Sequence, residues 1–241
     1  MSFIRTTVTP CDARRIERTH DWEIPAREVA RHVERRGRRH AYETLDAVAT
    51  ALVVIDLMAF FVETTPYARG IVDPVNRLAG ALRAAGGTVA WVTPAVGPPT
   101  DWARAFYGDA VAETYAASGA EPWAALDVAP GDLRVEKTSA SALFPGRSPL
   151  DGLLRDRGID TVLVAGAVTS VCVEATARDA ATLGYRTVVV ADACAGVDDA
   201  AHNATLRTIY RSYGDVRPTP DLIDLLLDAS QVLHHPDGVS H

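Results

Sequence analysis

The chain has 241 residues, 48% of them hydrophobic, and carries a formal net charge of −7 at pH 7. This length supports one sizeable core, and the negative charge argues against a general affinity for nucleic acid. No stretch approaches the ~18 unbroken apolar residues of a membrane helix, and the N-terminus lacks the apolar region of a signal peptide. The three cysteines are too few for a disulfide framework, which favours a reducing compartment. We therefore expect a cytoplasmic protein with no nucleic-acid or membrane partner.

Residues 1–48 differ in composition from the rest of the chain. They hold ten arginines but also eight acidic residues, so this is neither a nucleic-acid-binding tail nor an acid-poor transit peptide. A charged helical run follows Ile24 and Pro25, which predicts an arm and a helix that pack on the domain or on a neighbouring subunit. Residues 49–233 form the expected main domain, and residues 234–241 a polar tail that frays.

The main domain alternates short apolar runs with helical patterns. The runs predict strands at 50–55, 88–92, 133–135, 161–165, 187–191 and 215–216. The helical patterns lie at 71–85, 101–117, 150–157, 170–183, 198–210 and 221–227. This alternation is typical of a parallel sheet with helices on both faces. We predict a three-layer α/β/α, Rossmann-like fold with a six-stranded, mainly parallel sheet in the order 3-2-1-4-5-6, plus the N-terminal helical arm.

Two reactive side chains follow strands that this order makes neighbours. Asp56 ends the run at 50–55, and Cys172 opens the helix after the run at 161–165, so both are expected in one crevice. A thiol in the first turn of a helix is expected to have a lowered pKa, and the free N–H groups there can bind an oxyanion. A buried structural cysteine remains the alternative from position alone. Cys11 and Cys194 lack this context.

One basic residue differs in type from all the others. Of 24 basic residues, 23 are arginine and one is lysine, Lys137. A GC-rich genome explains the arginine excess but not the exception. A lysine ammonium is a compact charge with a tunable pKa, which arginine cannot replace at a tight catalytic position. Chance and a functional role remain equally open from this feature alone.

Three segments together resemble the isochorismatase-like cysteine hydrolases, over about residues 50–215. The segment 164–180, VAGAVTSVCVEATARDA, is similar to the signature of that family, and Gly184-Tyr185 and Asp192-Ala193 continue the match. Residues 53–56 with Phe60 and Phe61 resemble the strand of the catalytic acid. Residues 137–144, KTSASALF, resemble the lysine segment.

The resemblance implies a role for each matched residue. Cys172 would be the nucleophile, Asp56 would take the thiol proton and return it to the leaving nitrogen, and Lys137 would hold the pair. The N–H groups of Cys172 and Val168 would form the oxyanion hole, next to a cis peptide between Ala167 and Val168. A thiolate would attack a carbonyl, form an acyl-enzyme and be released by water.

Two departures from the family pattern narrow this interpretation. Met58 stands where the family usually has a glutamine, which suggests a more apolar pocket wall. The nicotinamidase branch binds a metal through Asp and His residues, but no histidine occurs between His40 and His202. We therefore expect no metal and no cofactor, and the histidines, mostly near the termini, are expected at the surface.

A retained Cys172 implies hydrolysis of a C–N bond in a carboxamide, ureido or lactam group of a small molecule. N-carbamoyl amino-acid amidohydrolases and streptothricin hydrolase are equally suitable relatives. Substrate-binding candidates are Phe61, Trp91, Trp102, Phe144 and Thr169, although the aromatic residues serve equally well for packing. We expect a homo-oligomer, a dimer or a tetramer.

Three other functions are alternatives to the hydrolysis of a C–N bond. A non-catalytic small-molecule-binding protein on the same fold would be expected to lose a member of the triad, and all three are present. An isochorismate-type vinyl ether hydrolase would not need the cysteine. A nucleotide-binding oxidoreductase is disfavoured because Asp56-Leu57-Met58, and no G-x-G-x-x-G motif, follows the first strand.

Overall fold

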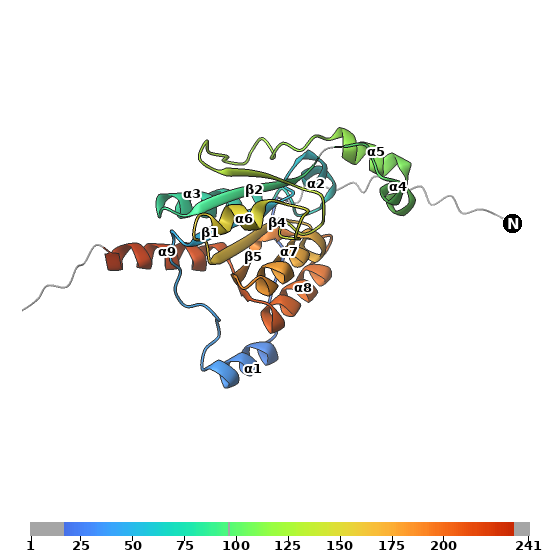
Figure 1. Ribbon diagram of the computed structural model, residues 1–241. Helices are drawn as coiled ribbons and strands as arrows, with labels where there is room; N and C mark the ends of the chain where they lie inside the picture. The colour runs from blue at the N-terminus through green and yellow to red at the C-terminus, as the bar shows by residue number, and fades with distance from the viewer. Residues whose placement is uncertain (1–16, 96, 234–241) are drawn as a thin grey trace, which may run out of the picture.

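The computed structural model describes residues 17–95 and 97–233, and it contains the predicted sheet (Figure 1). Its six strands are all parallel and lie in the order β3-β2-β1-β4-β5-β6, so the predicted fold class and strand order are confirmed. The expected tail at 234–241 and Cys11 lie outside the described residues. The strands are β1 (Thr50–Ile55), β2 (Thr88–Pro94), β3 (Leu133–Lys137), β4 (Thr161–Ala167), β5 (Arg186–Ala195) and β6 (Asp215–Arg217).

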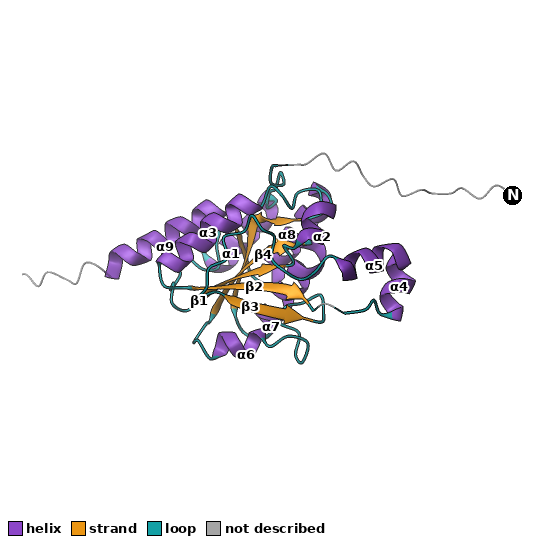
Figure 2. Ribbon diagram, turned by 90° about the horizontal axis from the view of Figure 1, so that it is seen from above, coloured by secondary structure: helices purple, strands orange, loops and turns teal. Residues whose placement is uncertain are grey.

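Helices cover both faces of the sheet (Figure 2). One face carries α3 and α9, and the other carries α6, α7 and α8, with α1 packed on α8. None of the described helices is long and apolar enough to cross a membrane. The helices are α1 (Ala26–Arg36), α2 (Ala59–Thr64), α3 (Val72–Ala84), α4 (Asp101–Tyr107), α5 (Asp109–Ala117), α6 (Leu150–Arg155), α7 (Glu174–Thr182), α8 (Asp199–Ser212) and α9 (Thr219–Leu233), and a π-helical turn, η1 (Thr169–Val173), precedes α7.

The continuous apolar strands supply two cores, because successive side chains point to opposite faces of the sheet. In β1, Leu52 and Val54 pack beneath α3 and α9, whereas Val53 and Ile55 pack beneath α6, α7 and α8. All six residues of β1 are buried. After Thr50, the central strand therefore has no polar residue until the chain leaves it at Asp56.

The structure differs from the expected elements in two places. The helix expected at 101–117 is divided at Gly108, whose φ of 83° lies in the left-handed region where glycine is favoured. The resulting pair, α4 and α5, projects from the body beyond β2 (Figures 1 and 2). The short helix α2 was not predicted, because six residues are too few to establish a helical period.

The described part of the N-terminal arm packs on its own domain. Buried Glu28 of α1 forms ion pairs with Arg207 and Arg211 of α8, at 3.1 and 3.2 Å. Leu45 and Ala47 contribute to the core beneath α3 and α9. The arm is therefore an integral layer of this fold.

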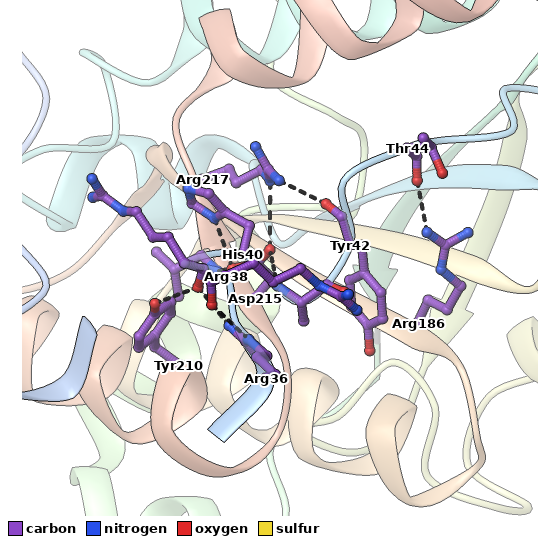
Figure 3. Close-up of polar contacts among 12 residues, drawn as sticks. Arg36, Arg38, His40, Tyr42, Thr44, Arg186, Tyr210, Asp215 and Arg217 are labelled. Carbon is purple, nitrogen blue, oxygen red and sulfur yellow. Dashed lines mark hydrogen bonds and ion pairs between the residues drawn. The ribbon is translucent and has the colours of Figure 1, made fainter. Parts of the chain in front are cut away.

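Residues 36–44, here called the strap, run along the edge strand β6 and the end of α8 (Figure 3). The Tyr210 hydroxyl donates to the Arg39 carbonyl at 2.5 Å, and His40 Nδ1 lies 3.0 Å from Asp215 Oδ1. Arg217 donates to the Tyr42 carbonyl at 2.6 Å. Because an exposed edge strand invites pairing with other chains, these contacts also protect β6.

The expectation that the histidines lie at the surface was wrong for three of them. His20, His32 and His202 are buried, with 4%, 8% and 0% of their area exposed. His20 stacks on His202 with ring centroids 4.0 Å apart, and it also lies within 2.6 Å of Asp199. The arm brings His20 to residues almost 180 positions away, a contact that no local pattern reveals.

Candidate active site

The site lies at the carboxyl ends of β1, β3 and β4. Asp56 follows β1, Lys137 ends β3, and Cys172 follows β4 in the turn η1. The strand order places β4 directly beside β1, and the long lysine side chain reaches across the end of β2. Parallel strands end at the same edge, which is where ligands bind in such sheets.

Local backbone geometry directs Asp56 into this crevice. Its φ is 55°, the left-handed region that a non-glycine residue occupies at a cost on the order of 1–3 kcal/mol. Its N–H donates to the Val92 carbonyl of β2 at 2.8 Å, which secures the turn. Opposite it, Gly166 of β4 has a φ of 114°, and a β-carbon there would collide with the Ile55 carbonyl. The close approach of β1 and β4 therefore depends on this glycine.

The three predicted catalytic side chains meet in a buried cluster. Lys137 Nζ lies 2.8 Å from Asp56 Oδ2 and 3.8 Å from Cys172 Sγ. Lys137 also donates to the Ser139 carbonyl at 3.0 Å. The exposed fractions are 1% for Asp56, 3% for Lys137 and 7% for Cys172, so water barely screens their charges. Asp56 Oδ1 is buried without a hydrogen-bond partner among the described residues.

The electrostatics of the cysteine contradict the expectation of a lowered thiol pKa. Burial, followed by the negative charge of Asp56, raises the pKa of Cys172 to about 12. The Lys137 charge and the Val168 N–H group act in the opposite direction without cancelling that rise. Position at a helix start was not enough to predict a lowered thiol pKa, because the loss of water around the sulfur raises the pKa more than the few N–H groups there lower it. The resting group is a thiol that needs a base.

Asp56 is placed to be that base. Burial raises the pKa of its carboxyl above the usual range, while Lys137 and the Cys172 thiol act against that rise. A raised pKa makes the carboxylate a better proton acceptor than an exposed aspartate. Oδ1, which has no hydrogen-bond partner among the described residues, can accept such a proton.

The loop before Cys172 carries the other predicted groups. The peptide bond between Ala167 and Val168 is cis, at the position where the family resemblance implies one. The Val168 carbonyl accepts from the N–H groups of Val171 and Val173, at 2.9 and 3.3 Å, which shapes η1. The Val168 N–H is directed to the sulfur and lowers its pKa, as an anion-stabilising donor does.

The substrate-binding candidates are not all brought together. Trp91 was wrongly placed at the site: it is 2% exposed, packs beneath α3 and α9, and donates from Nε1 to Asp132 at 2.7 Å. Alternation along β2 sends its side chain to that face, whereas Cys172 belongs to the core on the other face. Trp102 stacks on Phe106 in α4 and is 63% exposed, so it forms no wall of an enclosed site.

The remaining candidates each lie within a few residues, along the chain, of a member of the cluster. The Thr169 hydroxyl lies 3.0 Å from His202 Nδ1 and is therefore engaged by the protein. Phe144 follows the lysine loop and is 51% exposed. Phe61 is half-buried and meets Phe60 and Tyr115 edge to face.

Tyr115 of α5 carries a charge-sensitive hydroxyl near the cluster, and the sequence interpretation did not select it. Its pKa is raised by burial first and then by the charges of Asp56 and Cys172, which places its hydroxyl within their field. In the sequence Tyr115 appears only as an aromatic residue within a helical pattern, and ordinary packing residues have the same appearance.

The chain belongs to the isochorismatase family, because residues 50–221 match the model of the isochorismatase domain. It is 34% identical over 192 residues to the uncharacterized isochorismatase family protein YecD of Escherichia coli O157:H7, covering 76% of this chain and 98% of that protein. It is 35% identical over 192 residues to the maleamate amidohydrolase of Pseudomonas putida, covering 73% of this chain and 86% of that enzyme. The crystal structure of a cysteine hydrolase from Pseudomonas syringae pv. phaseolicola is also similar, with a TM-score of 0.72, 28% identity, and coverage of 79% of this chain and 97% of that one. The chain is thus an isochorismatase-family hydrolase.

Proposed function

We propose that this hydrolase is a metal-independent cysteine amidohydrolase, which cleaves a C–N bond in a carboxamide, ureido or lactam group of a small molecule. The observation that carries the proposal is the buried contact of one acid, one ammonium and one thiol, with Lys137 2.8 Å from Asp56 and 3.8 Å from Cys172. The likeness to maleamate amidohydrolase supports the same class of bond.

The geometry suits a two-step acyl transfer. Asp56 takes the proton of the Cys172 thiol as the sulfur bonds to the substrate carbonyl carbon, and the N–H groups of Val168 and Cys172 stabilise the oxyanion. Asp56 then gives that proton to the leaving nitrogen, the C–N bond breaks, and a thioester remains. Water attacks the thioester and transfers a proton to Asp56, the C–S bond breaks, and Asp56 returns the proton to sulfur. Lys137 keeps the carboxylate in position throughout.

The raised pKa of Cys172 supports this order of events. A thiol with a pKa of about 12 holds almost no free thiolate at neutral pH, so nucleophile formation and attack are coupled to proton transfer. A permanently ionised cysteine would not need a buried base at its side.

Replacement of the nucleophile tests the proposal. Ammonia release from amides and ureas, and ring opening of lactams by mass spectrometry, are measured over a panel, and Cys172→Ala should lower the turnover of any substrate by on the order of 10⁴-fold or more. Cys194→Ala is the matched control, because Cys194 is buried in the same core but its thiol donates a hydrogen bond to the Val164 carbonyl. Near-wild-type turnover by Cys172→Ala, or hydrolysis of a vinyl ether and of no C–N bond, would contradict the assignment.

Metal independence is a separate part of the proposal. Within 17–95 and 97–233, no group of three or more His, Cys, Asp or Glu side chains is arranged to hold a metal ion. Lys137 already supplies a positive charge beside Asp56. Activity should therefore survive exhaustive dialysis against EDTA and 1,10-phenanthroline. A loss that added zinc or iron restores would overturn this part alone.

We also infer a cytoplasmic homo-oligomer, a dimer or a tetramer. Trp102, Phe106 and Tyr107 of α4 are 63%, 69% and 52% exposed, and such an apolar patch is typical of an interaction surface.

A further inference from the structure

The turn η1, which carries Cys172, begins at Thr169, and the side chain of that residue is bound outside the turn. Its hydroxyl lies 3.0 Å from Nδ1 of His202, in the first turn of α8, and both residues are 0% exposed. The Thr169 carbonyl accepts from the N–H of Glu174, where α7 begins. One side-chain hydrogen bond therefore connects α8 to the residue at which η1 starts.

One face of the His202 ring is covered by the N-terminal arm. His20 stacks on it with ring centroids 4.0 Å apart and an interplanar angle of 17°. The Gly196 N–H donates to Nε2 of His20 at 2.8 Å, so His20 carries its proton on Nδ1 and donates to Asp199 at 2.6 Å. Burial keeps His202 neutral, because it lowers the pKa of the ring to about 3. The contact with Thr169 is therefore a hydrogen bond between two neutral groups, and the ring that makes it is fixed in place.

A second hydrogen bond of α8 reaches the same region but not the turn. Thr205, three residues after His202, donates to Oε2 of Glu174 at 2.9 Å. Arg178 binds the other oxygen of that carboxylate at 2.6 Å. Thr205 thus attaches α8 to α7, whereas His202 attaches α8 to the start of η1.

We propose that His202 is a positioning residue for the turn η1, acting through the Thr169 hydroxyl. This inference deepens the proposed function and rests on it. In the proposed reaction, η1 places the Cys172 sulfur near Asp56, next to the Val168 N–H group. A displacement of ~1 Å in such a site costs up to about 10²-fold in rate. Because this loss falls on the transition state, it lowers kcat and leaves KM nearly unchanged.

Two substitutions of His202 separate positioning from packing. The amide of asparagine takes the place of Nδ1, whereas the amide of glutamine takes the place of Nε2. His202→Asn should therefore keep kcat within about fivefold of the wild type, and His202→Gln should lower kcat by about 10- to 100-fold with little change in KM. A role in packing alone predicts the reverse order, because asparagine leaves the larger cavity. Equal kcat values in the two variants, or a lower kcat in His202→Asn, would overturn the inference.

The other partner of the hydrogen bond gives an independent test. Thr169→Val removes the hydroxyl at nearly constant size and should lower kcat as His202→Gln does. The double variant should be no slower than the slower single variant, because both changes remove the same interaction. Thr205→Val is the matched control, since it removes the other α8 hydrogen bond, and its kcat should change by less than about twofold. Effects that multiply in the double variant, or an equal loss in Thr205→Val, would refute a positioning role.

Hydrogen exchange separates this inference from the proposed function, because it needs no substrate. Mass spectrometry of the peptide that spans residues 168–174 should show at least about tenfold faster amide exchange in His202→Gln than in the wild type. Exchange in His202→Asn and Thr205→Val should stay near that of the wild type. Unchanged exchange in His202→Gln overturns the inference. The expected exchange pattern in a protein that hydrolyses no C–N bond would refute the proposed function alone.

Discussion

Two aspartates of this fold are equally buried but differ in how many of their carboxylate oxygens have hydrogen-bond partners. Asp215 of β6 is 0% exposed, and both of its oxygens have partners: His40 and the Val216 N–H at Oδ1, and the Ala41 N–H at Oδ2, each at 3.0 Å. Asp56 is 1% exposed; Lys137 lies 2.8 Å from Oδ2, and among the described residues Oδ1 has no hydrogen-bond partner.

The difference separates a carboxylate that holds the fold together from the one that we propose as the catalytic base. A satisfied buried carboxylate holds elements together, here the strap and β6 (Figure 3). A half-satisfied one keeps an oxygen available for a proton, and the surrounding fold compensates the cost of burying it. Lys137, Asp215 and the pH dependence of activity test this contrast directly, and the stacked histidines extend it to a second kind of buried titratable group.

The largest effect is expected at Lys137. Guanidinium is larger, planar and fixed in its charge, so Lys137→Arg should misplace Asp56 and lower kcat by on the order of 10²–10⁴-fold, nearly as much as Lys137→Ala. The thermal stability of Lys137→Arg should change little, because the buried Asp56 carboxylate keeps a cationic partner. Arg134→Ala, on the exposed face of β3 and paired at the surface with Glu121, is the control. More than about a third of wild-type kcat/KM in Lys137→Arg, a loss below ~1 kcal/mol, would show that any cation suffices.

At Asp215 the effect should fall on stability. Asp215→Asn removes the charge that faces Arg217, an ion pair at 3.5 Å in which both side chains are buried. Breaking a buried pair costs about 3–5 kcal/mol, measured by urea denaturation, and kcat/KM at temperatures where the variant is folded should be unchanged. Asp127→Asn is the surface control, because Asp127 is 67% exposed in its pair with Arg83 and should cost less than ~1 kcal/mol.

Acid should weaken the attachment of the arm through the stacked histidines. Burial lowers the pKa of His202 to about 3, with the neighbouring His20 as the second cause, and the pKa of His20 is lowered by burial as well. A folded pKa below the unfolded value of about 6.5 means that stability is present above that value and is lost as pH falls below it. The expected loss for His202 alone is about 2 kcal/mol between pH 7 and pH 5.

His202→Asn provides the matched comparison, since it keeps a polar atom for Thr169 without a titrating ring. Urea denaturation of both proteins at pH 7 and pH 5 should show a smaller acid loss in the variant. The same acid loss in both would assign the effect to other groups.

The smallest effect concerns the acid limb of the activity profile. Because burial raises the pKa of Asp56, the base becomes protonated at a higher pH than the ~3.9 of an exposed aspartate. The kcat/KM should therefore fall with decreasing pH around a midpoint above 4. A midpoint at or below 4, at pH values where circular dichroism shows a folded protein, would contradict the assigned base.

Short-range patterns alone determined much of this protein. Continuous apolar runs between helical periods established the parallel sheet, because a strand buried on both faces has no polar face to alternate. The same runs placed Asp56 and Cys172 at strand ends, and the lone Lys137 stood out by composition. Residue type and position made these three residues candidates, and the resemblance of three segments to the isochorismatase-like cysteine hydrolases selected them.

Only the tertiary structure decided how deep each side chain lies and what surrounds it. Trp91 was assigned to the wrong face, since the register of β2 relative to its neighbours determines that face. The Cys172 pKa was expected to fall and instead rises, because exclusion of water depends on the packing of several elements at once. Tyr115 and the stacked histidines escaped notice for the same reason: their partners lie tens to nearly two hundred residues away, and only the folded chain brings them together.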